Sequence, residues 1–230
     1  MSFANQYLFQ LGNKETYLED DYILGSANVE AFELLKHYHL LDDVGYGRMV
    51  FLNGAANSGK THLANIWQSN TGALKILEKD FYNDNYIEKI KSRKFLIIED
   101  IEKLKIFEKK LFFMINRVLE NKAYLLVTSC KTPHNLNFDL LDLVSRLKAF
   151  NYVAIKDPDL ELLRGVFLKL LIDRQLKVSL EILNFIMQRI ERTFQAIAEI
   201  VNKLDQLSLS TKRNITIPFI NEHFSFLNLK

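Results

Sequence analysis

Residues 54–61 have the types and spacing of a site that binds nucleotide phosphates. They read Gly-Ala-Ala-Asn-Ser-Gly-Lys-Thr and fit the pattern G-x-x-x-x-G-K-[ST] at every specified position. Small residues let successive backbone N–H groups surround phosphate oxygens, and a helix that starts here adds positive potential. Lys60 would reach the β and γ phosphates, and the Thr61 hydroxyl would ligate Mg²⁺. An ordinary glycine turn has no need of Lys and Thr at these two positions.

Two carboxylates, Glu99 and Asp100, directly follow the apolar run 95–98. An ATPase of this type needs an acid at the end of a second strand, where it holds the Mg²⁺ shell and orients water. Paired acids also occur in simple turns, but the phosphate-binding motif favours the catalytic interpretation. Thr128 ends a further apolar run and could touch the γ-phosphate or merely cap a loop. The residues leave both interpretations open.

These groups need a parallel sheet to position them. Short apolar runs alternate with helix-like segments, which predicts an α/β fold with a five-stranded parallel sheet covered by helices. The predicted strands are 48–52, 74–77, 95–98, 124–128 and 152–155, and the first two helices are 28–41 and 60–68. Three helices (159–174, 180–190, 192–208), a β-like run at 215–217 and a helix opened by Pro218 should follow. We therefore expect a tail (1–14), an α/β base (15–156) and a small helical lid (157–230).

Composition excludes several classes of protein. Among 230 residues, 48% are hydrophobic and no apolar run is long enough to span a membrane, so we expect a globular, cytoplasmic protein. The single cysteine, Cys130, excludes an internal disulfide and multi-cysteine zinc sites, and we expect it to be an ordinary buried thiol. A net charge of +2 argues against a protein that coats nucleic acid.

The residues resemble AAA+ ATPases of the DnaA family and are most similar to its Hda branch, the regulatory inactivators of DnaA. The phosphate-binding motif continues as Thr61-His62-Leu63, and residues 143–147, Leu-Val-Ser-Arg-Leu, are similar to the family's Ser-Arg-Leu/Phe signature. Residues 191–194 (Glu-Arg-Thr-Phe), 204–207 (Leu-Asp-Gln-Leu) and 215–219 (Ile-Thr-Ile-Pro-Phe) look more like Hda than DnaA. The resemblance covers nearly the whole chain.

The resemblance implies ADP or ATP with Mg²⁺ as cofactors and assigns roles to particular residues. Arg146 resembles the arginine finger that reaches a neighbouring subunit's nucleotide, and Arg192 resembles the sensor 2 arginine of the lid. Taken alone, each arginine more often forms a surface salt bridge. Glu99 would associate with Mg²⁺ together with Thr61. The nucleotide-binding set comprises Tyr22, Ile23, Gly54, Asn57, Ser58, Gly59, Lys60, Thr61, His62, Thr128 and Arg192.

Two positions depart from the family pattern. Glu99 stands where DnaA has Asp, and Cys130 stands where DnaA has an acid. Nucleotide binding should survive both changes because the phosphate-binding loop is intact. We therefore expect weak or no intrinsic ATP hydrolysis.

The segment Gln6-Tyr7-Leu8-Phe9-Gln10-Leu11 precedes all predicted structure. It resembles the Hda-type peptide that binds the replicative sliding clamp, the β subunit of DNA polymerase III, and Gln6, Tyr7, Phe9 and Leu11 would be its contacts. Tyr7, Phe9 and Leu11 alternate, so they share one side of an extended chain. The alternative is a tail that packs on the protein's own core.

The resemblance implies a regulator of replication initiation that binds adenine nucleotide and the DNA-loaded clamp and promotes hydrolysis of DnaA-bound ATP. One alternative is an autonomous ATPase of the helicase-loader type, with Glu99 and Asp100 as its catalytic acids. Another is a nucleotide-dependent adaptor in which Arg146 is idle. We expect no sequence-specific DNA binding, because the sequence ends where DnaA continues into a helix-turn-helix. A homo-oligomer is a further expectation, because AAA+ sites are completed between subunits.

Overall fold

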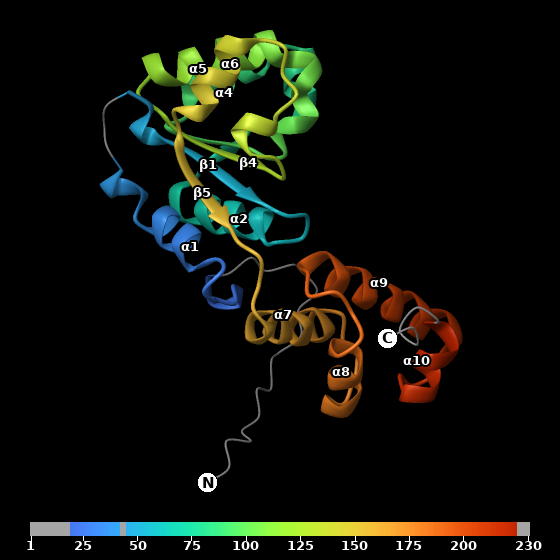
Figure 1. Cartoon of the computed structure of the whole chain (residues 1–230). Coiled ribbons are helices and arrows are strands. Elements are labelled where there is room, and N and C mark those ends of the chain that lie inside the picture. The colour runs from blue at the N-terminus through green and yellow to red at the C-terminus, as the bar shows by residue number, and fades with distance from the viewer. Residues whose placement is uncertain (1–18, 42–44, 225–230) are drawn as a thin grey trace.

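The computed structural model describes residues 19–41 and 45–224. Five parallel strands form one sheet in the order β2-β3-β4-β1-β5 (Figure 1). Their bounds are Met49–Gly54 (β1), Leu74–Lys75 (β2), Phe95–Ile98 (β3), Tyr124–Ser129 (β4) and Asn151–Ile155 (β5). The predicted α/β fold with a five-stranded parallel sheet is therefore confirmed.

Helices cover both faces of the sheet (Figure 1). One face carries α1 (Val29–Lys36) and α2 (Lys60–Thr71), and the other carries α4 (Tyr86–Ser92), α5 (Glu108–Glu120) and α6 (Leu141–Lys148). The short α3 (Glu78–Tyr82) follows β2. Short 3₁₀ segments lie at Glu19–Asp21, Tyr38–Leu40, Gly45–Arg48, Ile101–Phe107 and Pro133–Asn135.

Alternate residues of β1, β3 and β4 belong to two different hydrophobic clusters. In β3, Ile97 packs with the cluster that includes α1 and α2, whereas Leu96 and Ile98 pack with the cluster of α5 and α6. Both faces of the sheet are thus buried, which explains why the strands are continuous apolar runs rather than alternating ones.

The strand prediction at 74–77 was too long. The Leu77 backbone N–H donates to the Asp80 carboxylate at 2.7 Å, so the chain turns into α3 after the Ile76 N–H has donated to Ile97 O. The predicted helix 28–41 also ends early, at Lys36. The 3₁₀ turn that follows places the Tyr38 ring edge-on against Trp67, with centroids 5.9 Å apart.

Four helices follow the sheet and form a small lid: α7 (Leu160–Asp173), α8 (Leu180–Met187), α9 (Phe194–Thr211) and α10 (Ile217–His223). Each begins after a side chain that accepts a backbone N–H, namely Asp159, Ser179, Thr193 and Thr216. The predicted β-like run at 215–217 is wrong. Ile215 is buried, the Thr216 hydroxyl accepts the Phe219 N–H, and Pro218 in the first turn favours a helix start.

The lid and the base share one hydrophobic cluster. Leu162 and Phe167 of α7 belong to the same cluster as Leu52 of β1. At the junction, the Ser26 hydroxyl donates to the Asp159 carboxylate at 2.9 Å. No helix in the described part of the chain is long and apolar enough to cross a membrane.

Candidate nucleotide-binding site

The phosphate-binding loop lies between the end of β1 and the start of α2. Lys60 is 6% exposed, and its Nζ donates to the carbonyl oxygens of Gly54 and Ala55, each at 2.8 Å. Gly59 has a φ of 94°, a left-handed conformation that favours glycine. Asn57, with a φ of 61°, adopts the same region, and Ser58 is buried. Thr61 is exposed in the first turn of α2.

The Tyr22 ring packs against this loop at Gly59. A Cβ atom on Gly59 would lie 3.2 Å from the Tyr22 ring, so the ring requires glycine there as well. The ring also lies edge-on to His62, with centroids 5.1 Å apart, and stacks on Phe32 at 5.9 Å. Burial raises the pKa of the Tyr22 phenol well above its usual value, so the group stays neutral. The structure thus brings Tyr22, Gly59 and His62 together.

Ile23 occupies a different place. It packs against Gly165 of α7, where an added Cβ would lie 3.2 Å from the Ile23 side chain. Asn28 fixes the turn around it, since its Nδ2 donates to Ile23 O and its Oδ1 accepts the Gly25 N–H. Ile23, which the sequence placed in the nucleotide-binding set, therefore joins the base to the lid. Its contact with the nucleotide stays a prediction.

Each of the two predicted acids is paired with a lysine. Glu99 Oε1 lies 2.5 Å from Lys75 Nζ, and Asp100 Oδ2 lies 2.6 Å from Lys103 Nζ. The hydrogen bond that the Lys103 ammonium donates to the Asp100 carboxylate raises the pKa of Lys103, so this lysine stays charged. The Thr128 hydroxyl accepts the Asp100 N–H at 3.1 Å and so ties the end of β3 to β4.

These pairs bear on the expected Mg²⁺. Its two expected ligands were the Thr61 hydroxyl and the Glu99 carboxylate. The hydroxyl is exposed at the start of α2, but Glu99 already contacts the ammonium of Lys75. A carboxylate neutralised by a lysine is a poor ligand for a divalent cation, which prefers ionised, uncompensated oxygens. The residues at the end of β3 do not fit the cation as the sequence predicted.

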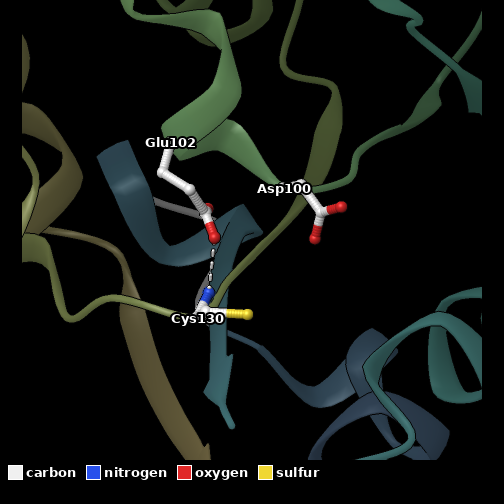
Figure 2. Close-up of side chains that lie close together, drawn as sticks. All are labelled: Asp100, Glu102 and Cys130. Carbon is white, nitrogen blue, oxygen red and sulfur yellow. Dashed lines mark hydrogen bonds between the residues drawn. The ribbon is translucent and has the colours of Figure 1, made fainter. Parts of the chain in front are cut away.

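Cys130 is exposed, so the prediction of a buried thiol was wrong. It follows the last residue of β4 and lies outside the sheet, with its Sγ 3.3 Å from Lys60 Nζ. Figure 2 shows its backbone N–H donating to the Glu102 carboxylate, at 2.9 Å, with Asp100 nearby. One ligand atom from each of these three residues lies within 4.8 Å of the others. Of these three residues, Cys130 contacts the P-loop lysine.

The two predicted arginines lie on α6 and just before α9. Arg146 is half-buried on α6, across the sheet from α2 (Figure 1). Arg192 is exposed directly before Thr193, the residue that caps α9. Within residues 19–41 and 45–224, no hydrogen bond or ion pair joins either arginine to the loop. The clamp-binding prediction, with Gln6, Tyr7, Phe9 and Leu11, lies outside the described residues.

Sequence reasoning missed Lys75 and Lys103. Lys75 had a usable signal, because it is a single charge within the apolar run 73–77. A charge in a buried strand requires a partner. The sequence does not say which acid provides it, because that depends on the neighbouring strand.

Comparisons with known proteins agree with this architecture. The family model described as "Hda, lid domain" matches residues 172–224. Domain III of the replication initiation protein DnaA from Thermotoga maritima aligns with a TM-score of 0.75 and 19% identity, over 94% of this chain and 99% of that one. DnaA from Aquifex aeolicus bound to AMPPCP aligns with a TM-score of 0.68 and 19% identity, over 85% of this chain and 66% of that one.

A more distant structure and a curated sequence extend the comparison. Thermotoga maritima RuvB, the Holliday junction branch migration motor, aligns with a TM-score of 0.59 and 17% identity, over 90% of this chain and 71% of that one. An uncharacterized protein from Haemophilus influenzae is 25% identical over 183 residues, which is 75% of this chain and 79% of that protein. The chain thus has the fold of domain III of DnaA, and residues 172–224 are similar to the lid domain of Hda.

Proposed function

We propose that this DnaA-like protein binds an adenine nucleotide in its P-loop and promotes hydrolysis of the ATP bound to DnaA. The intact motif around Lys60 supports nucleotide binding, as does the similarity to a DnaA structure bound to AMPPCP. The lid match to Hda supports a role in the control of replication initiation. The resemblance of the tail, residues 6–11, adds the DNA-loaded sliding clamp as the place where the protein acts.

The observation that carries this proposal is the environment of Arg146. Its Nη1 donates to the Tyr46 hydroxyl at 3.1 Å, and its guanidinium lies 4.3 Å from the centre of the Phe112 ring. No carboxylate within the described ranges forms an ion pair with it. Its two partners are neutral, so they orient the guanidinium and leave its charge uncompensated. Such a group is suited to bind phosphate oxygens.

Arg146 would act on another subunit's nucleotide. It lies on α6 and has no contact with the chain's own P-loop in the described part of the protein. An arginine supplied to a neighbour's nucleotide can raise hydrolysis by roughly three to five orders of magnitude. The ATP of a DnaA molecule docked against α6 is the substrate that this arrangement would serve.

The experiment measures hydrolysis of labelled ATP already bound to DnaA, in the presence of clamp-loaded DNA. Wild type should accelerate hydrolysis, and Arg146→Ala should not. Arg146→Lys, which keeps the charge but loses the planar fork, should retain little of the effect. Lys148→Ala is the matched control, because Lys148 is an exposed cation on the same helix. If Arg146→Ala is as active as wild type, Arg146 is idle and the protein is an adaptor.

The autonomous ATPase is the weaker candidate. It requires Glu99 to serve the chain's own nucleotide, yet Glu99 is paired with Lys75. Steady turnover by the purified protein alone, abolished by Lys60→Ala, would favour that candidate over ours.

A further inference from the structure

We infer that Lys75 is a built-in counter-ion for Glu99, so that this chain binds its nucleotide without a contribution from a divalent cation. The inference rests on the proposed nucleotide binding. It assigns Lys75 as a positioning residue, because Lys75 acts through Glu99.

The sheet register brings the two side chains together. Lys75 of β2 is paired with Ile97 of β3, and paired residues of parallel strands point to the same face. Glu99 follows Ile97 by two positions, so it continues on that face. There the Lys75 ammonium reaches Glu99 Oε1 at 2.5 Å. The pair thus follows from the order of the strands.

Helix α2 provides a third member of this arrangement. Lys75 Nζ also donates to Asn65 Oδ1 at 2.5 Å. Asn65 lies four residues after Thr61, so both are on one face of α2. The ammonium is therefore anchored on the helix that begins with the phosphate-binding lysine, on the side of the expected Mg²⁺ ligand Thr61.

The Lys75–Glu99 pair is more buried than the neighbouring Lys103–Asp100 pair. The side chains of Lys75 and Glu99 are 24% and 22% exposed, whereas those of Lys103 and Asp100 are 70% and 37% exposed. Solvent and salt screen the exposed pair strongly and the partly buried pair much less. Glu99 is therefore held firmly by its lysine, and Asp100 is held weakly.

The ion pair of Glu99 and Lys75 is accessible to solutes. A cleft of about 200 Å³ is lined by both acid–lysine pairs together with Ile76, Leu77, Glu78 and Leu104. A cation in solution could thus reach Glu99 if the lysine were absent. The positive charge of Lys75, rather than steric exclusion by the fold, therefore keeps a cation away from Glu99.

The test measures the dissociation constant for ADP by calorimetry, once with excess Mg²⁺ and once with EDTA. It uses wild type, Lys75→Gln, Glu99→Gln and the double variant. Lys79→Gln is the control, because it removes an exposed lysine from the adjoining helix α3. Circular dichroism checks that each variant is folded.

We expect the wild-type and Lys79→Gln affinities to change by less than about two-fold between the two conditions. In Lys75→Gln, Mg²⁺ should tighten ADP binding by about ten-fold, the equivalent of one new charge-assisted contact. The double variant should lose this gain, because the released carboxylate is then absent.

A wild-type affinity that rises about ten-fold or more with Mg²⁺ would overturn the inference while leaving nucleotide binding intact. So would a folded Lys75→Gln that responds to Mg²⁺ as wild type does. If Lys75→Gln does not fold, the wild-type and Glu99→Gln proteins still test the inference. It requires that Mg²⁺ leave the ADP affinity of both proteins unchanged. If wild type binds no ADP in either condition, the proposed nucleotide site itself fails, and this inference fails with it.

Discussion

Two charged regions of this protein differ in whether their charges are compensated by a charge of opposite sign. At the end of β3, Glu99 and Asp100 are each matched by a lysine. On α6, Arg146 is held by a phenol and an aromatic ring, with no acid among the described residues. A compensated charge is unavailable for new ligands, whereas an oriented and uncompensated one is available. In the function that we propose, the first region belongs to the site that holds the protein's own nucleotide, and the second acts on the nucleotide of another protein.

Lys60→Ala should have the largest effect on the first region. Removing this buried ammonium takes away the cation that the motif presents to phosphate, and we expect ADP affinity to fall by about 100-fold. Calorimetry measures the loss. The variant protein should keep Arg146 in place, so residual stimulation of DnaA at saturating ADP would separate the two regions. An unchanged affinity would show that the loop does not bind nucleotide.

Lys75→Gln should destabilise the fold by about 1–2 kcal/mol, because it leaves a partly buried carboxylate without its partner. The more exposed pair should matter less, so Lys103→Gln should cost under about 0.5 kcal/mol. Urea unfolding compares the two variants. If the two substitutions lower the free energy of unfolding equally, Glu99 and Asp100 do not differ in how strongly their lysines compensate them.

Tyr46→Phe tests the second region, around Arg146. It removes the hydroxyl that accepts from Arg146 and keeps the ring, so stimulation of ATP hydrolysis on DnaA should fall about three- to ten-fold through poorer orientation. The thermal midpoint should hardly move, because the substitution removes no apolar surface. A loss of stimulation that merely follows a loss of folded protein would contradict the positioning role.

Asp159→Asn tests the junction between base and lid, outside both regions, and should have the smallest effect. The Leu162 N–H and the Ser26 hydroxyl donate to this carboxylate, which lowers its pKa below the usual 3.8. Its charge therefore stabilises the fold above that value, and the contribution is lost as pH falls through the lower, folded-state pKa. Thermal unfolding should show a small advantage of wild type at pH 7 that vanishes in acid. An advantage that persists in acid would assign the effect to shape rather than charge.

The fold was largely predictable because its signals are local. The P-loop motif, the doubly buried strands and the capped lid helices each depend on a few adjacent residues. The β-like run at 215–217 failed because its apolar residues serve the lid core and Thr216 caps a helix. Cys130 was misplaced because burial of a residue just beyond a strand depends on what covers the sheet edge.

The site was less predictable because its decisive pairs are long-range. Glu99 was identified from its position after a strand, but its lysine lies on another strand, and only the sheet order makes them neighbours. Arg146 was identified through resemblance alone. Its Tyr46 partner lies 100 residues away in sequence, so no local pattern could have indicated it.

The most direct test places the label on one protein at a time. ATP labelled at the γ-phosphate is loaded either on this protein or on DnaA, the two are mixed with clamp-loaded DNA, and phosphate release is followed over a single turnover. Our account predicts rapid release when DnaA carries the label and little release when this protein carries it. Rapid release from this protein's own ATP, with none from DnaA, would contradict the account and identify an autonomous ATPase.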